Sequence, residues 1–186
     1  MGKLFFTSDL HFGHDREFIW GPRGFKSVDE MNETLLYKWN DTVGLYDDVY
    51  MLGDFILGDP KNIEWVKRLN GYIHVVRGNH DTDQRMSLYM DCSNVVESSE
   101  GQYFKYNGQN FYLNHYPTFT SNLEKSDKLK EHVINLYGHT HQQTNFYQGI
   151  PFMYHVGVDS HNCYPVSVEQ IFKDIKAEVN KCKSYL

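Results

Sequence analysis

Short apolar runs alternate with longer amphipathic stretches in the first half of the chain. Three runs, at residues 3–8, 48–52 and 72–76, have the length and composition of buried strands. The stretches between them carry apolar side chains at helical spacing: Val28, Met31, Leu35 and Trp39 in the first, and Ile63, Val66 and Leu69 in the second. This strand–helix–strand order predicts βαβ units with parallel neighbouring strands and right-handed crossovers.

Capping residues mark where the helices begin. Ser27 with Glu30, and Ser167 with Gln170, form the S-x-x-E/Q pattern of a capping box. The second of these predicts a C-terminal helix. The Asp-Pro pair at residues 59–60 places an N-cap carboxylate before a proline at the first helical position, which starts the helix between the second and third strands.

The second half of the chain predicts mostly strands. Strand-like runs lie at residues 94–97, 102–106, 111–113 and 133–137, and Asn107-Gly108 is a strong hairpin signal. Two further segments complete the pattern: a closing hairpin at 144–147 and 152–158, and a polar connection at 118–131 that could hold a short helix.

Composition favours one globular domain covering residues 1–186. The chain is 40% hydrophobic and 16% aromatic, which is enough for a sizeable core. Its net charge of −6 argues against binding to long nucleic acids, which depends on many Lys and Arg contacts. Three scattered cysteines without a CxxC pair fit a reduced compartment, and no signal or membrane-spanning run is visible. We therefore expect a cytoplasmic protein with no membrane partner; its oligomeric state stays open.

Chemically active residues gather just after the predicted strands. In chain order, these residues are Asp9 with His11, then Asp54, then Asn79-His80-Asp81, then His115, and finally His139 with His141. Residues two apart in an extended chain point to the same side, so Asp9 and His11 form a ligand pair. The mixture of oxygen and nitrogen ligands suits two borderline divalent ions, with Mn²⁺ favoured and Fe²⁺, Zn²⁺ or Ni²⁺ as alternatives.

These five blocks, taken in order, resemble those of the calcineurin-like metallophosphoesterases. The matching residues are Asp9-x-His11, Gly53-Asp54, Gly78-Asn79-His80-Asp81, His115 and Gly138-His139-x-His141. Any one block is a weak signal, whereas the ordered set is specific. The resemblance implies an α/β fold in which two β-sheets form a sandwich flanked by helices in αββα layers.

The resemblance also implies a role for each residue. The first ion would be held by Asp9, His11 and His141, the second by Asn79, His115 and His139, and Asp54 would bridge the two. A metal-bridging hydroxide would attack the phosphorus in line. His80 would act as the catalytic proton donor to the leaving oxygen, and Asp81 would orient or charge His80.

Contacts with the substrate are assigned to three residues. Arg23, His14 and Asn79 are the candidates, although His14 could instead cap its loop and Arg23 could be a solvated surface residue. Tyr116 either stacks on a base or packs on Pro117, and we favour packing. The roles of His155 and Ser160 stay open.

The chain is therefore expected to be a binuclear, metal-dependent phosphoesterase. The nearest resemblance, to small bacterial and phage enzymes, favours a phosphodiesterase that acts on a small nucleotide-like or cyclic-phosphate substrate. The alternatives are a phosphomonoesterase or nuclease of the same family, and a non-catalytic metal-binding interaction module.

Overall fold

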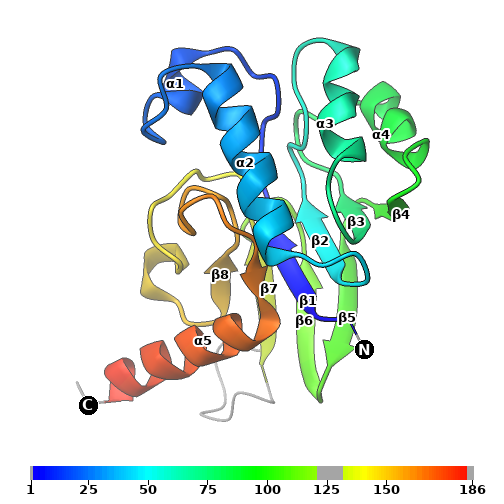
Figure 1. Cartoon of the computed structure of the whole chain (residues 1–186). Coiled ribbons are helices and arrows are strands. Elements are labelled where there is room, and N and C mark those ends of the chain that lie inside the picture. Colours follow the sequence, from blue (N-terminus) through cyan, green and yellow to red (C-terminus); the bar gives the residue numbers. More distant parts are fainter. Residues whose placement is uncertain (1, 121–131, 184–186) are drawn as a thin grey trace.

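Two β-sheets face each other in the computed structural model, which describes residues 2–120 and 132–183 (Figure 1). The first sheet has the strand order β4 (Val95–Ser99), β3 (Tyr72–Val76), β2 (Asp48–Leu52), β1 (Leu4–Thr7) and β9 (Val166–Ser167). The second has the order β5 (Gln102–Tyr106), β6 (Gln109–Leu113), β7 (Val133–Tyr137) and β8 (Met153–His155). Most of the polar connection predicted at 118–131 lies outside the described residues.

Most neighbouring strands are parallel, as the βαβ pattern predicts. Strands β1 to β4 run parallel, and β9 pairs with β1 in the antiparallel sense. In the second sheet, β5 and β6 form the predicted antiparallel hairpin, while β6, β7 and β8 are parallel. The predicted two-sheet sandwich with flanking helices is confirmed.

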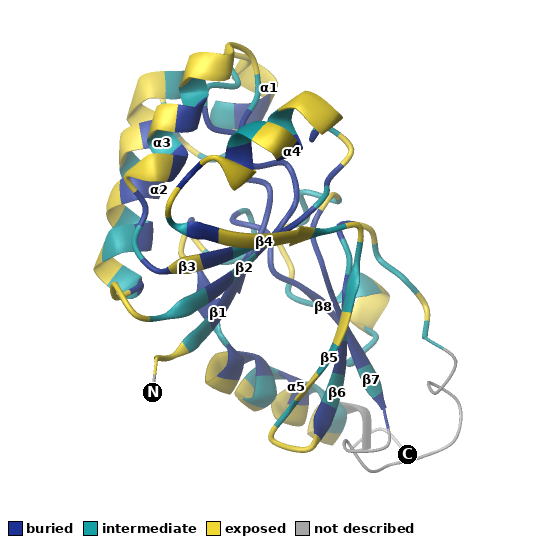
Figure 2. Ribbon diagram, turned by 90° about the vertical axis from the view of Figure 1, so that its right-hand side faces the viewer, coloured by how far each residue is buried: buried dark blue, intermediate teal, exposed yellow. Residues whose placement is uncertain are grey.

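The helices lie on the outside of the sandwich. Helices α2 (Val28–Thr42), α3 (Ile63–Lys67) and α4 (Asp83–Met90) cover the outer face of the five-stranded sheet (Figure 2). The long α5 (Val168–Lys183) crosses the lower end of the sandwich in that view. A four-residue helix, α1 (Glu17–Trp20), precedes α2, and the described residues also form the short 3₁₀ turns η1 (Pro60–Asn62) and η3 (Tyr147–Gly149).

Alternation along the parallel strands divides the core into two clusters. Phe5 of β1 faces the helices and packs in a cluster with Trp39 of α2. The next residue, Phe6, faces the second sheet and packs with Phe111 of β6 and Ile171 of α5. Strands buried on both faces read as continuous apolar runs, which is why these strands were visible in the sequence.

The predicted caps form, and several short elements were not predicted. The backbone N–H of Glu30 donates to Ser27 Oγ at 3.2 Å, and that of Gln170 donates to Ser167 Oγ at 3.2 Å. Helices α1 and α4 and the two-residue β9 had no counterpart in the sequence interpretation. The closing hairpin predicted at 144–147 and 152–158 is confirmed only in part: its second arm contains β8, which pairs with β7, and a single antiparallel bridge between Phe146 and Tyr154 joins the two arms.

The lengths and compositions of the helices show whether any of them could cross a membrane. Within the described residues, none of the helices has the length and apolar character needed to cross a bilayer.

Phe6 provides a test of the packing between the sheets. Its ring lies 5.6 Å from that of Tyr50 and 6.4 Å from that of Phe111, measured between centroids. Phe6→Ala should lower the free energy of unfolding by about 3–5 kcal/mol in urea denaturation, because it leaves a cavity between the sheets. Tyr103→Ala, at a β5 side chain that is 59% exposed, is the control and should change it by under about 0.5 kcal/mol. Similar values for the two variants would contradict this description of the core.

Candidate metal centre

The carboxyl ends of the parallel strands meet at one edge of the sandwich. Thr7 of β1 pairs with Met51 of β2, and Met51 pairs with Val75 of β3, so the loops after these strands begin side by side. A parallel bridge between Ser8 and Gly157 joins the two sheets at the same edge. Ligands bind at strand ends of this kind in α/β folds, and the loops here carry the five polar blocks.

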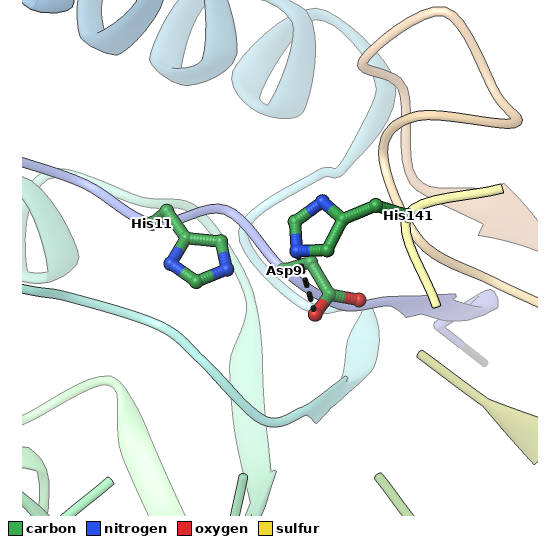
Figure 3. A group of neighbouring side chains, drawn as sticks. All are labelled: Asp9, His11 and His141. Atoms are coloured by element: carbon green, nitrogen blue, oxygen red, sulfur yellow. Dashed lines mark ion pairs between the residues drawn. The ribbon is translucent and has the colours of Figure 1, made fainter. Parts of the chain in front are cut away.

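Asp9, His11 and His141 form the first group of possible metal ligands. One ligand atom from each lies within 4.8 Å of the others, and His141 Nε2 is 3.8 Å from Asp9 Oδ1 (Figure 3). His11 is buried, and its Nε2 has no hydrogen-bond partner. A buried polar atom without a partner is costly, and a cation among these three residues would remove that cost.

Asn79, His115 and His139 form the second group. Asn79 Oδ1 lies 2.9 Å from His115 Nε2 and 2.8 Å from His139 Nδ1. The Nδ1 of His115 lies 2.8 Å from the carbonyl oxygen of Leu52, which can only accept, so this nitrogen carries the proton. In the neutral ring, Nε2 therefore presents a lone pair to the Asn79 oxygen. Two acceptors facing each other at this distance are compatible with a cation bound to both, so these residues fit a metal ion.

Asp54 lies between the two groups. Its Oδ2 is 3.6 Å from His11 Nε2 in the first group and 3.5 Å from His115 Nε2 in the second. Burial raises the pKa of Asp54, and the neighbouring His115 opposes that rise. The position is the one expected of a ligand that two ions share.

The backbone is unusual at the ligands themselves. Asp9, His11, Asp54, His139 and His141 all have positive φ angles, between 48° and 66°. Such angles are uncommon outside glycine, and strained residues of this kind cluster at functional sites. Five of the seven predicted ligands therefore occupy a conformation that ordinary packing does not favour.

Several imidazoles at the centre are kept neutral. Burial lowers the pKa of His11, and the positive charge of Arg23 lowers it further. Burial likewise lowers the pKa of His139 and brings that of His14 to about 4. Because a histidine coordinates a metal through an unprotonated nitrogen, these shifts favour metal binding near pH 7.

His141 is held by two residues from distant parts of the chain. Its Nδ1 lies 2.9 Å from Asp159 Oδ2, and Asp159 accepts two hydrogen bonds from Arg23, at 2.9 and 3.0 Å. Burial alone would lower the pKa of His141, but the hydrogen bond to Asp159 and the nearby Asp9 raise it overall. This arrangement fixes the ring so that Nε2 points toward Asp9.

The predicted role of Arg23 as a substrate contact is wrong. Its side chain is only 2% exposed, and its guanidinium also donates to the backbone carbonyls of Asp9 and Leu10. Each of its N–H edges is occupied inside the protein, so Arg23 supports the ligand loop. Asp159, its partner, was missed because it lies 136 residues away in the sequence.

Asp81 also acts differently from the prediction. Its carboxylate accepts from the backbone N–H groups of Asp54 at 2.7 Å and Gly78 at 2.9 Å, and from Tyr89 Oη at 2.7 Å. It therefore ties two ligand loops together, and the prediction that it orients the His80 imidazole is corrected. A Cβ at Gly78 would collide with Asp54, which explains the glycine in this block.

An open pocket of about 620 Å³ lies over the ligand groups. His80 and His14 both line it, and the side chain of His80 is 43% exposed. The backbone fixes His80, because its N–H donates to Asp54 Oδ1 at 2.9 Å and its carbonyl accepts from the Arg85 guanidinium. Asn79 also lines the pocket, so it remains a candidate for substrate contact as well as for metal binding.

His155 and Ser160, whose roles were left open, lie beneath the centre. His155 is buried, and its Nδ1 is 2.7 Å from Ser160 Oγ. Neither residue lines the pocket. A side chain at Gly157 would collide with His155 and crowd Asp9 Oδ2, so the histidine packs closely behind the first group. The ring of Tyr116 lies 4.7 Å from that of His139, beside the second group, and its packing on Pro117 stays a prediction.

Comparison with known proteins identifies the family. Residues 3–158 match the profile of the calcineurin-like phosphoesterase superfamily domain. The chain belongs to this family. Members generally bind divalent metals, in agreement with the clustering of Asp9 with His11 and His141, and of Asp9 with Asp54 and His115, at this edge.

Relatives of this phosphoesterase occur in an archaeon and in phages. An uncharacterized protein of Methanocaldococcus jannaschii is 33% identical over 188 residues, covering 95% of this chain and 93% of the relative. The gene 66 protein of Mycobacterium phage D29 is 27% identical over 95% of this chain and 98% of its own length. The crystal structure of a protein of unknown function from Aquifex aeolicus has the same fold, with a TM-score of 0.69 at 22% identity, covering 93% of this chain and 99% of that one.

The contact between Asp159 and His141 can be tested by metal titration. Asp159→Asn should weaken the binding of one Mn²⁺ ion about 10- to 100-fold in calorimetry, because the His141 ring loses the carboxylate that orients it. Binding of the second ion should stay within error. Asp91→Asn, an exposed carboxylate outside the pocket, is the matched control. Unchanged affinity in Asp159→Asn would contradict the role of Asp159 in orienting His141 for metal binding.

Proposed function

We propose that this family member is a binuclear, metal-dependent phosphodiesterase that acts on a small nucleotide-like or cyclic-phosphate substrate. One observation carries the proposal: Asn79 Oδ1 lies 2.9 Å from His115 Nε2 and 2.8 Å from His139 Nδ1, beside the first ligand group. A cation bound to Asn79 Oδ1 and to both imidazoles accounts for this convergence of ligand atoms. Asp54 then stands between two cation sites, which is the arrangement used for in-line phosphoryl displacement.

Each ligand group would hold one divalent ion. Asp9, His11 and His141 would bind the first, Asn79, His115 and His139 the second, and Asp54 both. Mn²⁺ is the first ion to test, and Fe²⁺, Zn²⁺ and Ni²⁺ are compatible with the same ligands. When bound, the ions supply positive charge to the phosphoryl oxygens and lower the pKa of water at the centre.

The chain's own residues complete the chemistry. His80 stands at the pocket wall with its Nε2 4.0 Å from Asp54 Oδ2, and its main chain is fixed at both the N–H and the carbonyl. We assign it the transfer of a proton from Nε2 to the leaving oxygen. The hydrogen bonds of Asp81 hold the loops of Asp54 and Gly78 together, so His80 keeps its place relative to the ligands.

The pocket favours a diester over a monoester. Within the described residues its lining contains no Lys or Arg, and Arg23 is turned inward. The bound ions are then the main positive charges available to the substrate. A diester carries one negative charge where a monoester carries nearly two at neutral pH, so it needs less compensation. We therefore expect the kcat/KM for bis(4-nitrophenyl) phosphate to exceed that for 4-nitrophenyl phosphate.

His80→Ala separates the catalytic proposal from its alternatives. The variant should lower kcat for bis(4-nitrophenyl) phosphate about 10²- to 10⁴-fold, because the leaving oxygen loses its proton donor. Metal analysis should still find two ions per chain. His74→Ala, on β3 outside the pocket, is the matched control and should keep full activity.

Three results would each favour another function. A higher kcat/KM for the monoester would indicate a phosphomonoesterase, and cleavage confined to polynucleotides would indicate a nuclease. Absence of turnover in the wild-type protein with two ions bound would indicate a non-catalytic metal-binding module. Activity that survives chelation, after metal removal has been verified by elemental analysis, would contradict the proposal as a whole.

A further inference from the structure

The pocket has a second, apolar wall that the metal centre does not use. Phe18, Ile19 and Pro22, from α1 and the turn that follows it, line the pocket together with His14 and His80. A phosphoryl group fills only a small part of about 620 Å³, which is the size of a pocket for an organic ligand. The remaining space is therefore available to the group esterified to the phosphate.

Phe18 is the distinctive residue of this wall. Its side chain is 70% exposed, although large apolar residues in the same segment are buried or partly buried. A single exposed aromatic ring is common on protein surfaces, so exposure alone does not mark a site. Phe18 differs because it lines the pocket and because its ring is oriented by His14, edge to face, at a centroid distance of 5.6 Å and an angle of 87°.

The contacts connect Phe18 to the first ligand group. His14 Nδ1 lies 3.3 Å from Nδ1 of His11, which belongs to that group. Ile19, the next residue along α1, is buried in the core cluster of the helices and holds the short helix in place. The ring of Phe18 thus stands one side chain away from the centre, on an anchored support, with much of its surface open.

We propose that Phe18 is the stacking platform for a planar aromatic group carried by the substrate, with a nucleobase as the natural occupant. The inference rests on the proposed phosphodiesterase function. With the phosphate at the centre, a group attached to it extends along the wall of Phe18, Ile19 and Pro22. Aromatic stacking accepts any base, because every base has a π-face. Gln143, an exposed amide on the pocket lining, can donate and accept hydrogen bonds at the edge of that base.

Substrates that differ only in the base provide the test. Adenosine 5′-(methyl phosphate) and ribose 5-(methyl phosphate) present the same diester, with and without an aromatic group. Phe18→Ala should raise KM for the adenosine compound about 5- to 150-fold, the effect of losing one stacking contact, and leave kcat nearly unchanged. KM for the ribose compound should stay within about twofold. Phe18→Tyr, which keeps the ring, should restore the wild-type KM.

Two further variants serve as controls. Tyr37→Ala removes an aromatic ring that is 66% exposed on α2, away from this pocket, and should change nothing. Tyr116→Ala removes the ring that contacts His139 on the other side of the centre. A loss of base preference in Tyr116→Ala but not in Phe18→Ala would overturn the assignment, as would an equal effect of Phe18→Ala on both substrates.

Bis(4-nitrophenyl) phosphate, whose aromatic groups are not nucleobases, shows whether Phe18 stacks on nucleobases only or on any planar ring. A KM increase in Phe18→Ala for the adenosine compound alone would assign the platform to nucleobases. An increase for both would assign it to planar rings in general. Both results support stacking on Phe18, whereas an increase for neither contradicts it.

Failure of this inference can be told apart from failure of the proposed function. If wild-type protein with Mn²⁺ cleaves no diester, the function fails and binding becomes the readout. Calorimetry would then compare adenosine 5′-monophosphate with ribose 5-phosphate on the Mn²⁺-loaded protein. Tighter binding of the adenosine compound that disappears in Phe18→Ala would sustain the platform, and equal binding of the two by wild-type protein would overturn it.

Discussion

Left-handed backbone at Asp9, His11, Asp54, His139 and His141 is the constraint on which the rest of the centre depends. Each such residue costs about 1–3 kcal/mol, so the surroundings must hold it in place. Backbone hydrogen bonds that continue past the strand ends hold these residues in place. Asp9 N–H donates to the carbonyl of Gly53 at 3.0 Å, and His11 N–H donates to that of Asp54 at 3.0 Å. The two sheets thus provide a rigid frame that turns the ligands toward one another.

The same frame explains how the proposed reaction would bring an anionic phosphoester to an acidic protein. Buried carboxylates and imidazoles form a site with an affinity for cations, and bound cations are often the largest local charges in such a site. Asp159 orients His141, and Asp81 ties the loops of Asp54 and Gly78 together. Asp159 and Asp81 are not assigned as ligands, and they contribute to the site by positioning the residues that are. The net charge of −6 therefore does not predict whether the site at this edge attracts anions or cations.

The sequence was most informative where one physical rule decided the outcome. Apolar runs such as residues 72–76 identified strands buried on both faces, and residues placed directly after these strands were brought together as expected. It was least informative about contacts between distant segments. Arg23 and Asp159 are 136 residues apart, and no local sequence pattern around either residue predicts that they form an ion pair. Helix α4 has a clear cap at Thr82 but is only eight residues long and buries only Met86 and Tyr89, and β9 is too short to leave a pattern.

The central claim is that this edge of the sandwich binds two divalent ions at defined places. A crystal structure of the protein grown with Mn²⁺, with anomalous scattering recorded at the manganese edge, tests it most directly. We predict two anomalous peaks about 3.5–4 Å apart, one among Asp9, His11 and His141 and the other among Asn79, His115 and His139, with Asp54 touching both. A single peak, or peaks away from these residues, would contradict it.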